Sequence, residues 1–251
     1  MLDRAGAELR VFASNAALID AAAREIGVYA RACVKDHGTF SIVLAGGNTP
    51  AELYRALARC VDAYGRTGNP SAPPWEHTQL WFGDERCVPP AHPDSNYRMA
   101  HEALIGPLRL SDDRVHRMKG ELSPAEAAAS YEAEIRAAFG DRPRFDLVLL
   151  GIGEDGHTAS LFPDTLALAV RDKIVTDNYV PRLDAHRITL TMPTLCAAKR
   201  AWIFAVGERK ADILAQVLDG PRDRFPVQQV RTDDTPVVWW LDEPAAAKLH
   251  A

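Results

Sequence analysis

The chain has 251 residues, of which 47% are hydrophobic and 25% charged, and its formal net charge is −5. This composition is ordinary for a globular protein with a sizeable core, and it argues against bulk binding to nucleic acid or to a membrane surface. The four cysteines, at positions 33, 60, 87 and 196, form neither a C-x-x-C pair nor a zinc-ligand spacing. No stretch has the apolar length of a signal peptide or a membrane span. We therefore expect a cytoplasmic protein with reduced thiols.

Helical and strand patterns alternate in the first half of the chain. Residues 14–36 are alanine-rich, carry apolar side chains at helical spacing and precede Gly38, which predicts a helix. The elements expected next are a strand at 40–45, a helix at 50–65, a strand ending at 83, a long loop, and a helix from about 95 to 105.

The second half continues this alternation. Ser123 as N-cap, Pro124 after it and Glu126 completing a capping box predict a helix at 123–139. The other elements expected are strands at 145–150, 187–190, 201–206 and 236–241, and a helix at about 209–218. Alternating strands and helices predict an α/β fold with a mostly parallel sheet that is covered by helices on both faces. The best linker, at 67–75, is short, so we expect a single domain over 1–251.

The first candidate motif is AGGNTP at 45–50, between a predicted strand and a predicted helix. Thr49 is a favourable N-cap, and Glu52 would complete a capping box. The N–H groups of Gly46 and Gly47, with the helix N-terminus, predict an anion site. A tight turn without a ligand explains the same residues equally well. The motif has no G-K-[ST] and is therefore not a nucleotide P-loop.

The second motif is WFGDERCVPPAHPDSNYRM at 81–99, which follows a predicted strand. Asp84 and Arg86 therefore lie at the carboxyl edge of the sheet, where open α/β sheets bind ligands. The Arg86 guanidinium can hold a phosphate through two hydrogen bonds. The alternative is a surface ion pair between Arg86 and Asp84 or Glu85, which would contribute little.

The third motif, FDLVLLGIGEDGHTASLFP at 145–163, is the most informative. Its apolar run predicts a strand buried on both faces, and the glycines that follow allow a sharp turn. Asp155 and His157 lie in that turn, so a carboxylate and an imidazole meet the ligand-binding edge. The G-x-G-x-x-G within it is typical of dinucleotide sites, but Glu154 and Asp155 would repel a pyrophosphate there.

Two further cations are candidates for binding an anionic ligand. Lys210 lies at the start of the predicted helix in AVGERKADIL, just after a strand, although a solvated lysine is common there. Arg187 begins a strand rather than ending one and is a weaker candidate. Together, two anion-binding elements, an Asp-x-Arg and an Asp-x-His at one edge predict a phosphorylated small molecule as ligand, with proton transfer or water activation.

These residues carry a resemblance to a known family. AGGNTP, FGDERCVP with DSNYRM, and GIGEDGHTASLFP resemble the motifs of the 6-phosphogluconolactonase family. The resemblance spans about residues 40 to 215 and extends to the wider superfamily with glucosamine-6-phosphate deaminase. It implies a Rossmann-like parallel sheet, a phosphate site at Gly46, Gly47 and Thr49, and no cofactor. It also places Asp84, Arg86, His157 and Lys210 on functional positions, with Arg187 as a further candidate for substrate binding.

The resemblance implies hydrolysis of 6-phospho-glucono-1,5-lactone to 6-phosphogluconate in the oxidative pentose phosphate pathway. His157 would be the general base for the attacking water, oriented by Asp155 or Asp84. Arg86, Lys210 and the amides of 46–49 would hold the phosphate. Backbone N–H groups of the 151–157 loop are the expected oxyanion donors. The expected partner is this small molecule alone, with no metal, and the protein would be a monomer or a weak homo-oligomer.

Two alternatives stay open. A deaminase or isomerase of an amino-sugar phosphate has a Glu within Asn-Glu-Pro after the His, where this chain has Leu161, Phe162 and Pro163. Phe162 cannot relay a proton, which argues against that chemistry. A sugar-phosphate sensor without catalysis would need an output module, and the sequence has no helix-turn-helix-like or basic segment.

Overall fold

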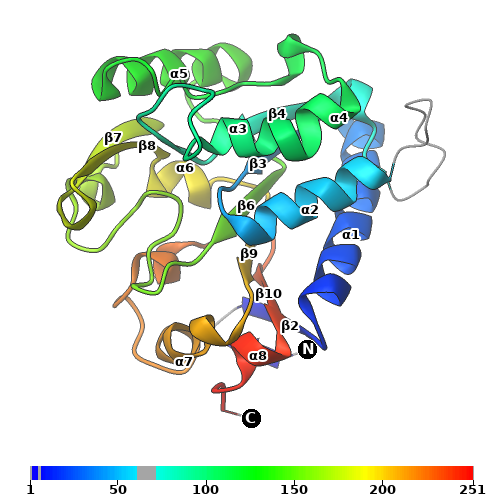
Figure 1. The fold of residues 1–251 in the computed structure, drawn as a ribbon, viewed down its shortest axis with the longest axis vertical. Coiled ribbons are helices and arrows are strands. Elements are labelled where there is room, and N and C mark those ends of the chain that lie inside the picture. The colour runs from blue at the N-terminus through cyan, green and yellow to red at the C-terminus, as the bar shows by residue number, and fades with distance from the viewer. Residues whose placement is uncertain (1, 5–6, 61–71, 251) are drawn as a thin grey trace.

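The computed structural model describes residues 2–4, 7–60 and 72–250 (Figure 1). The predicted end of the second helix, after residue 60, and most of the predicted linker at 67–75 lie outside the described residues. The helices are α1 (Asn15–His37), α2 (Asn48–Arg59), α3 (Asn96–Ala100), α4 (Gly106–Leu108), α5 (Pro124–Phe139), α6 (Met192–Cys196), α7 (Ala211–Leu218) and α8 (Glu243–Ala246). Within these ranges, none of the helices combines the length and the apolar character that crossing a bilayer requires.

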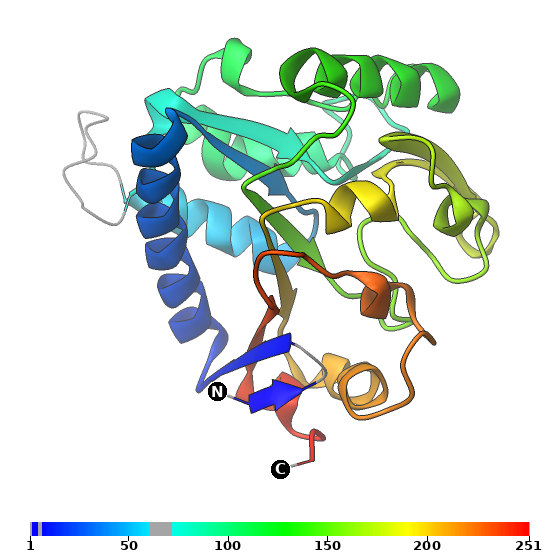
Figure 2. The same ribbon diagram turned by 180° about the vertical axis from the view of Figure 1, so that it is seen from behind.

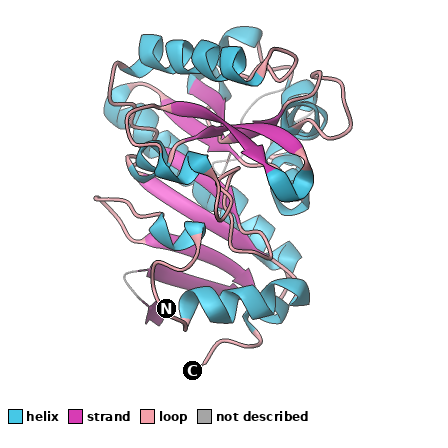
Figure 3. Ribbon diagram, turned by 90° about the vertical axis from the view of Figure 1, so that its left-hand side faces the viewer, coloured by secondary structure: helices cyan, strands magenta, loops and turns pink. Residues whose placement is uncertain are grey.

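A seven-stranded sheet forms the centre of the molecule. Its strands, in spatial order, are β1 (Leu2–Arg4), β2 (Ala7–Phe12), β10 (Val237–Asp242), β9 (Arg200–Ala205), β6 (Leu147–Gly151), β3 (Phe40–Leu44) and β4 (Thr78–Phe82). Every neighbouring pair is parallel except β1 with β2. Helices flank it on both faces, with α2 and α3 on one and α6 on the other (Figures 1, 2 and 3). The predicted Rossmann-like, mostly parallel fold is confirmed.

The order of the strands determines where a ligand can bind. From β3 the chain moves outward to β4, whereas from β6 it moves the other way, to β9 and β10. The loops that follow β3 and β6 therefore diverge at the carboxyl ends of two adjacent strands. Such a switch point is where open α/β sheets bind their ligands.

A second sheet of three antiparallel strands was not predicted. It contains β5 (Asp84–Arg86), β8 (Ala185–Leu190) and β7 (Val175–Val180). The stretch expected to be loop after residue 83 therefore begins with a strand. β5 has only three residues, all charged, and β7 buries the polar side chains of Thr176 and Asn178, so neither has an apolar pattern. Helix α5 covers this sheet, and its Glu132 accepts hydrogen bonds from two amides at the start of β7.

Gly38 follows α1 as predicted, whereas two predicted N-caps need correction. Ser14 caps α1 by accepting a hydrogen bond from the Ala17 N–H at 3.2 Å. Ser123 precedes α5 as expected, but its hydroxyl bonds the Glu126 carboxylate rather than a backbone N–H, so the predicted capping box is absent. Thr49 is not an N-cap either: α2 begins at Asn48, and Gly47 occupies the cap position.

The secondary structure differs from the prediction in two smaller respects. The helix expected at about 95–105 is divided into α3, a π-helical turn (His101–Ile105) and α4. Strand β2 was not expected, because Leu9 alone among its residues is buried and the apolar pattern is short. The short 3₁₀ turns are Trp75–His77, Asp112–Arg114, Leu166–Ala169, Pro181–Leu183, Glu208–Lys210 and Pro226–Gln229.

The core fills both faces of the large sheet. Trp239 and Trp240 are both buried in β10. Asp146 is the one charged residue in the predicted strand at 145–150, and it is buried as well. Its carboxylate accepts hydrogen bonds from the amide and hydroxyl of Ser41 and from the Lys199 ammonium at 2.8 Å. These partners offset the cost of burying the charge at the amino end of β6.

Candidate active site

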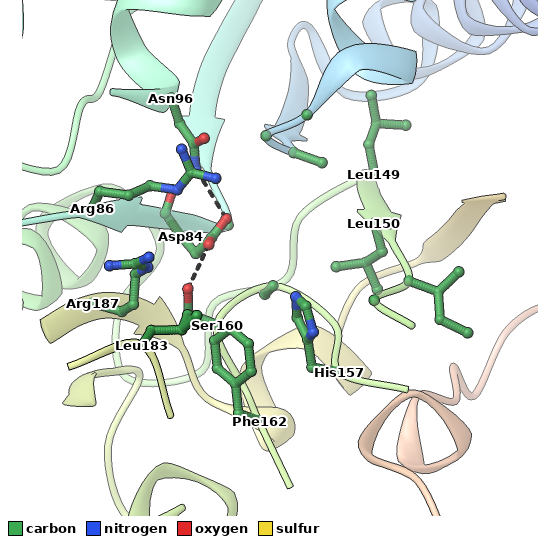
Figure 4. Close-up of a pocket in the computed structure, with 18 of the residues that line it drawn as sticks. Asp84, Arg86, Asn96, Leu149, Leu150, His157, Ser160, Phe162, Leu183 and Arg187 are labelled. Atoms are coloured by element: carbon green, nitrogen blue, oxygen red, sulfur yellow. Dashed lines mark hydrogen bonds between the residues drawn. The ribbon is translucent and has the colours of Figure 1, made fainter. Parts of the chain in front are cut away.

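A cavity of about 390 Å³ opens at the carboxyl ends of β3, β4 and β6, at the switch point (Figure 4). The β7–β8 hairpin and the turn before α7 complete its walls. The predicted site residues that line it are Gly46, Gly47, Asp84, Arg86, His157, Arg187 and Lys210. Residues of three sheet-edge loops and of the second sheet therefore meet in one cavity, although they span more than half of the sequence.

Asp155 and His157 form a hydrogen-bonded pair in the turn after β6. Asp155 Oδ1 lies 2.5 Å from His157 Nδ1 and also accepts from the His157 amide at 3.3 Å. This contact assigns the proton to Nδ1 and leaves Nε2 as the acceptor nitrogen of the neutral ring. Burial by itself raises the pKa of Asp155, but the hydrogen bond from His157 and the nearby positive charges together lower that pKa below its ordinary value. Asp155 is thus an ionised partner that orients the imidazole.

Gly153 makes the Asp155–His157 pair sterically possible. A Cβ at position 153 would lie 2.0 Å from His157 Nδ1 and 2.5 Å from Asp155 Oδ1, so only glycine fits. The Gly153 amide also donates to the His157 carbonyl at 2.9 Å, and the Gly156 amide donates to the Gly153 carbonyl at 3.0 Å. The sequence predicted a sharp turn here, and the structure shows that one of its glycines is required by side-chain contact.

Phe162 lies against the imidazole. Its ring stacks on that of His157, with centroids 4.0 Å apart and planes inclined by 26° (Figure 4). The Arg182 guanidinium lies 4.8 Å from the Phe162 ring centroid, and its Nη2 lies 2.6 Å from Asp155 Oδ2. The position that holds a proton-relaying Glu in the deaminase motif is therefore filled by an apolar ring that covers one face of the imidazole.

Asp84 is held at the cavity wall by two neighbours. Asp84 Oδ2 accepts from the Ser160 hydroxyl at 2.6 Å, and Oδ1 accepts from the Asn96 amide at 3.2 Å (Figure 4). The side chain is buried, so these bonds fix its orientation. No hydrogen bond joins Asp84 to His157 among the described residues, whereas Asp155 contacts the imidazole directly. Of the two carboxylates expected to orient the imidazole, Asp155 is therefore the one in position.

The glycine loop after β3 approaches Asn96 closely. A Cβ at Gly46 would lie 2.1 Å from Asn96 Oδ1, so the close approach requires glycine. Gly47 has a φ of 104°, a value that side chains rarely tolerate. Both glycines line the cavity, and in the described part of the chain their N–H groups donate to no acceptor. Thr49 lies inside α2 and is not among the residues that line the cavity, so its expected role in phosphate binding stays a prediction.

Arg86 and Arg187 lie directly opposite each other on β5 and β8. Each guanidinium donates to a backbone carbonyl, Arg86 to that of Asp94 and Arg187 to that of His186, and neither forms an ion pair within the described ranges. Burial and the charge of Arg86 lower the pKa of Arg187. Two adjacent cations without a carboxylate partner form a binding surface for an anion, which we call the arginine pair.

Lys210 reaches the cavity from the turn before α7. Its Nζ donates to the Ile152 carbonyl at 2.8 Å, so the ammonium is anchored beside the loop that carries His157. Burial lowers the pKa of Lys210. Lys210 therefore approaches the cavity beside the loop at 151–157 that carries His157, whereas the arginine pair lies on the second sheet.

The sequence reasoning missed several residues of the site. Ser160, Asn96 and Arg182 line the cavity, and none of them was a candidate. Asn96 begins α3, and Arg182 lies in the turn Pro181–Leu183. Glu85 was considered only as a surface partner, yet it is buried and accepts from the amides of Asn96 and Tyr97 at the start of α3. Burial raises the pKa of Glu85, although those amide bonds oppose the rise.

One group of three potential metal ligands occurs in the described residues. Cys33 and His37 of α1 and Asp146 before β6 bring their ligand atoms within 4.8 Å of one another. No sequence spacing could reveal this group, because Asp146 lies more than 100 residues from the other two. Lys199 already supplies the positive charge at Asp146 Oδ1. The group lies at the amino end of β6, opposite the cavity.

Comparisons with known proteins agree with the motifs. The model of the family "Glucosamine-6-phosphate isomerases/6-phosphogluconolactonase" matches residues 13–239. The chain belongs to this family. It is similar to the 6-phosphogluconolactonase of Bos taurus, with 37% identity over 96% of this chain and 93% of the relative. It is similar to that of Synechocystis sp., with 36% identity over 86% and 88% of the two chains. The solved 6-phosphogluconolactonase of Trypanosoma cruzi superposes with a TM-score of 0.82 at 28% identity, covering 98% and 97%.

Family membership gives the cavity a context but leaves two chemistries to distinguish. The family name covers both isomerases and lactonases. Phe162 occupies the position where the deaminase motif has its Glu, and the ring stacks on His157 instead of offering a carboxylate. Within this family, the cavity of this chain contains the Asp155–His157 pair and has an apolar ring at position 162.

Proposed function

We propose that this chain hydrolyses 6-phospho-D-glucono-1,5-lactone to 6-phospho-D-gluconate, a step of the oxidative pentose phosphate pathway. The observation that carries the proposal is the Asp155–His157 pair, with Phe162 stacked on the imidazole. The arginine pair lines the same cavity. An imidazole base suits water activation, and unpaired cations suit a phosphorylated substrate. Relatives named 6-phosphogluconolactonase, at 36–37% identity over most of the chain, support the same conclusion.

His157 acts as the general base in the first half of the reaction. Its Nδ1 donates to Asp155, so Nε2 accepts a proton from water while the water oxygen attacks C1 of the lactone. The tetrahedral intermediate then collapses, the bond from C1 to the ring oxygen breaks, and the imidazolium returns its proton to that oxygen. Asp155 stabilises the imidazolium that forms between the two steps. General base catalysis of this kind contributes on the order of 10²–10⁴-fold.

The arginine pair holds the phosphate in this proposal. Arg86 and Arg187 are adjacent, free of carboxylate partners in the described structure, and line the cavity from the second sheet. Lys210 is tied to the Ile152 carbonyl beside His157 and therefore acts nearer the reacting end of the substrate. The binding energy of the phosphate fixes the lactone carbonyl against the water.

The amides of Gly46 and Gly47 are the donors that we propose for the developing oxyanion. The loop at 151–157 was expected to supply them, and three of its amides, those of Gly153, Gly156 and His157, donate within the turn instead. The two glycine amides lie in the cavity wall and donate to no acceptor among the residues that the structure describes. Donors that are already oriented require no reorganisation when the oxyanion forms.

One assay separates this function from the deaminase reaction. Acid release from freshly made 6-phosphogluconolactone is followed by base titration, and ammonia release from glucosamine 6-phosphate is measured in parallel. We expect acid release well above spontaneous lactone opening, and no ammonia. Ammonia release without lactone hydrolysis would contradict the proposal, and binding of both compounds without turnover would favour a sensor.

Two properties of the protein are part of the proposal. We propose that it works in the cytoplasm, because its thiols are unpaired among the described residues and its substrate belongs to central metabolism. We also propose a monomer or weak homo-oligomer. The cavity described above is lined by residues of one chain, so no second copy is needed to complete it.

A further inference from the structure

We propose that Arg182 is a positioning residue for the catalytic pair, which it holds from the tip of the β7–β8 hairpin. This inference rests on the proposed function, in which His157 is the base. Arg182 lies in the short turn Pro181–Leu183, in the second sheet, far in sequence from the catalytic loop. It was not a candidate on sequence grounds.

The Asp155 carboxylate is shared between two partners. Oδ1 faces His157 Nδ1 at 2.5 Å, and Oδ2 faces Arg182 Nη2 at 2.6 Å. A carboxylate held at only one oxygen can rotate about its terminal bond, and the imidazole would follow it. The ion pair with Arg182 at the other oxygen restrains this rotation, and with it the direction in which His157 presents Nε2.

A second set of contacts joins the same residues. The Arg182 guanidinium lies over the Phe162 ring at 4.8 Å, and that ring stacks on His157 at 4.0 Å. The four side chains of His157, Asp155, Arg182 and Phe162 therefore form a closed cycle of contacts. Arginine suits this position because its planar cation can form an ion pair with a carboxylate and stack on an aromatic ring at once.

The alternative role for Arg182 is direct binding of the substrate phosphate, since the residue also lines the cavity. Its guanidinium, however, is already paired with a carboxylate, whereas Arg86 and Arg187 are not paired among the residues described. An anion would have to compete with Asp155 for Arg182. We therefore assign Arg182 to orientation of the base rather than to affinity.

Steady-state kinetics of Arg182→Ala and Arg182→Lys test this assignment. We expect kcat of Arg182→Ala to fall at least about tenfold, as for a base displaced by a fraction of an ångström, with KM for the lactone changed less than about twofold. Lysine keeps the charge but loses the planar stack, so Arg182→Lys should recover part of kcat. Arg209→Ala is the matched control, because Arg209 pairs with Glu154 at 2.9 Å in the same loop and is highly exposed. It should retain wild-type kcat.

Proton NMR gives a readout that does not depend on turnover. The proton between His157 Nδ1 and Asp155 should resonate far downfield, and its loss in His157→Asn assigns it. In Arg182→Ala we expect this resonance to broaden or move upfield, and in Arg209→Ala to stay. A higher KM with unchanged kcat would overturn the inference in favour of phosphate binding, as would an unchanged resonance. If the wild type fails to hydrolyse the lactone, the proposed function falls, while the NMR comparison still decides the role of Arg182.

Discussion

The catalytic loop after β6 and the arginine pair on the second sheet differ in how they are built. The loop brings Asp155, Gly153 and His157 together within five residues, and their contacts are local. The arginine pair joins residues 101 positions apart through the antiparallel register of β5 with β8. The contact of Asp155 with His157 can be predicted from a sequence motif. The arginine pair, in contrast, exists only after two short, polar strands have paired.

The two regions also have different roles in the proposed mechanism. In that mechanism, the loop supplies the base and its orientation, and the second sheet supplies positive charge. Arg182 connects them, because it extends from the hairpin of the second sheet to Asp155 in the loop. If this division is correct, substitutions in the loop should change the rate, and substitutions in the arginine pair should change affinity.

The largest effect is expected for His157→Asn, which keeps a polar side chain but removes the base. We expect kcat to fall by about two to four orders of magnitude, because an amide cannot accept the proton of water. Rates are corrected for spontaneous opening of the lactone. Affinity for 6-phosphogluconate should change little, since the arginine pair is intact. A variant that keeps more than about a tenth of wild-type kcat would remove His157 from the mechanism.

A smaller effect, on affinity, is expected for Arg86→Ala and Arg187→Ala. Loss of one charge-assisted contact costs about 1.5–3 kcal/mol, which corresponds to roughly 10- to 100-fold in KM. The preference for phosphorylated over free gluconolactone should narrow in both variants, with kcat less affected. Lys210→Ala provides the comparison. If Lys210→Ala narrows the preference for the phosphorylated lactone and the two arginine variants do not, the phosphate lies beside the loop that carries His157. The assignment of affinity to the arginine pair would then be wrong.

Asp155→Asn tests the electrostatics of the loop through stability. The pKa of Asp155 is lowered in the folded protein, so its ionised form stabilises the fold above the unfolded pKa of about 3.9. This contribution is lost as the pH falls through the folded pKa. The melting temperature of the variant should therefore be lower than that of the wild type at pH 7, and the difference should shrink below about pH 4. A difference that is constant with pH would mean that the charge of Asp155 is not what stabilises the loop.

The smallest effect is expected from metal removal. Dialysis against EDTA should leave kcat and KM unchanged. The three potential ligands Cys33, His37 and Asp146 lie at the amino end of β6, away from the cavity, and Lys199 already pairs with Asp146. Full loss of activity, restored by one metal ion, would contradict a mechanism in which His157 alone activates the water.

The sequence by itself determined the parallel core and the catalytic loop. Apolar runs such as 145–150 fix a buried strand whatever their partners, and glycines directly after a strand fix a turn at its carboxyl end. Asp155 and His157 are two residues apart, so their contact follows from local backbone geometry. Asp84 and Arg86 follow β4 in the sequence, and Lys210 follows β9, which predicted that the three residues share one edge of the sheet. All three line the cavity at that edge.

Only the tertiary structure decided which residues of that edge act together. β5 and β7 have no apolar alternation, so their pairing with β8 depends on non-local contacts with α5 and with one another. That pairing sets Arg187 beside Arg86 and brings Arg182 to Asp155. At Thr49 the local signal was misleading. Threonine is a favourable cap residue, but Gly47 occupies the cap position and Thr49 lies within α2. Local propensity is small compared with the energy of packing, and packing depends on segments that are distant in the sequence.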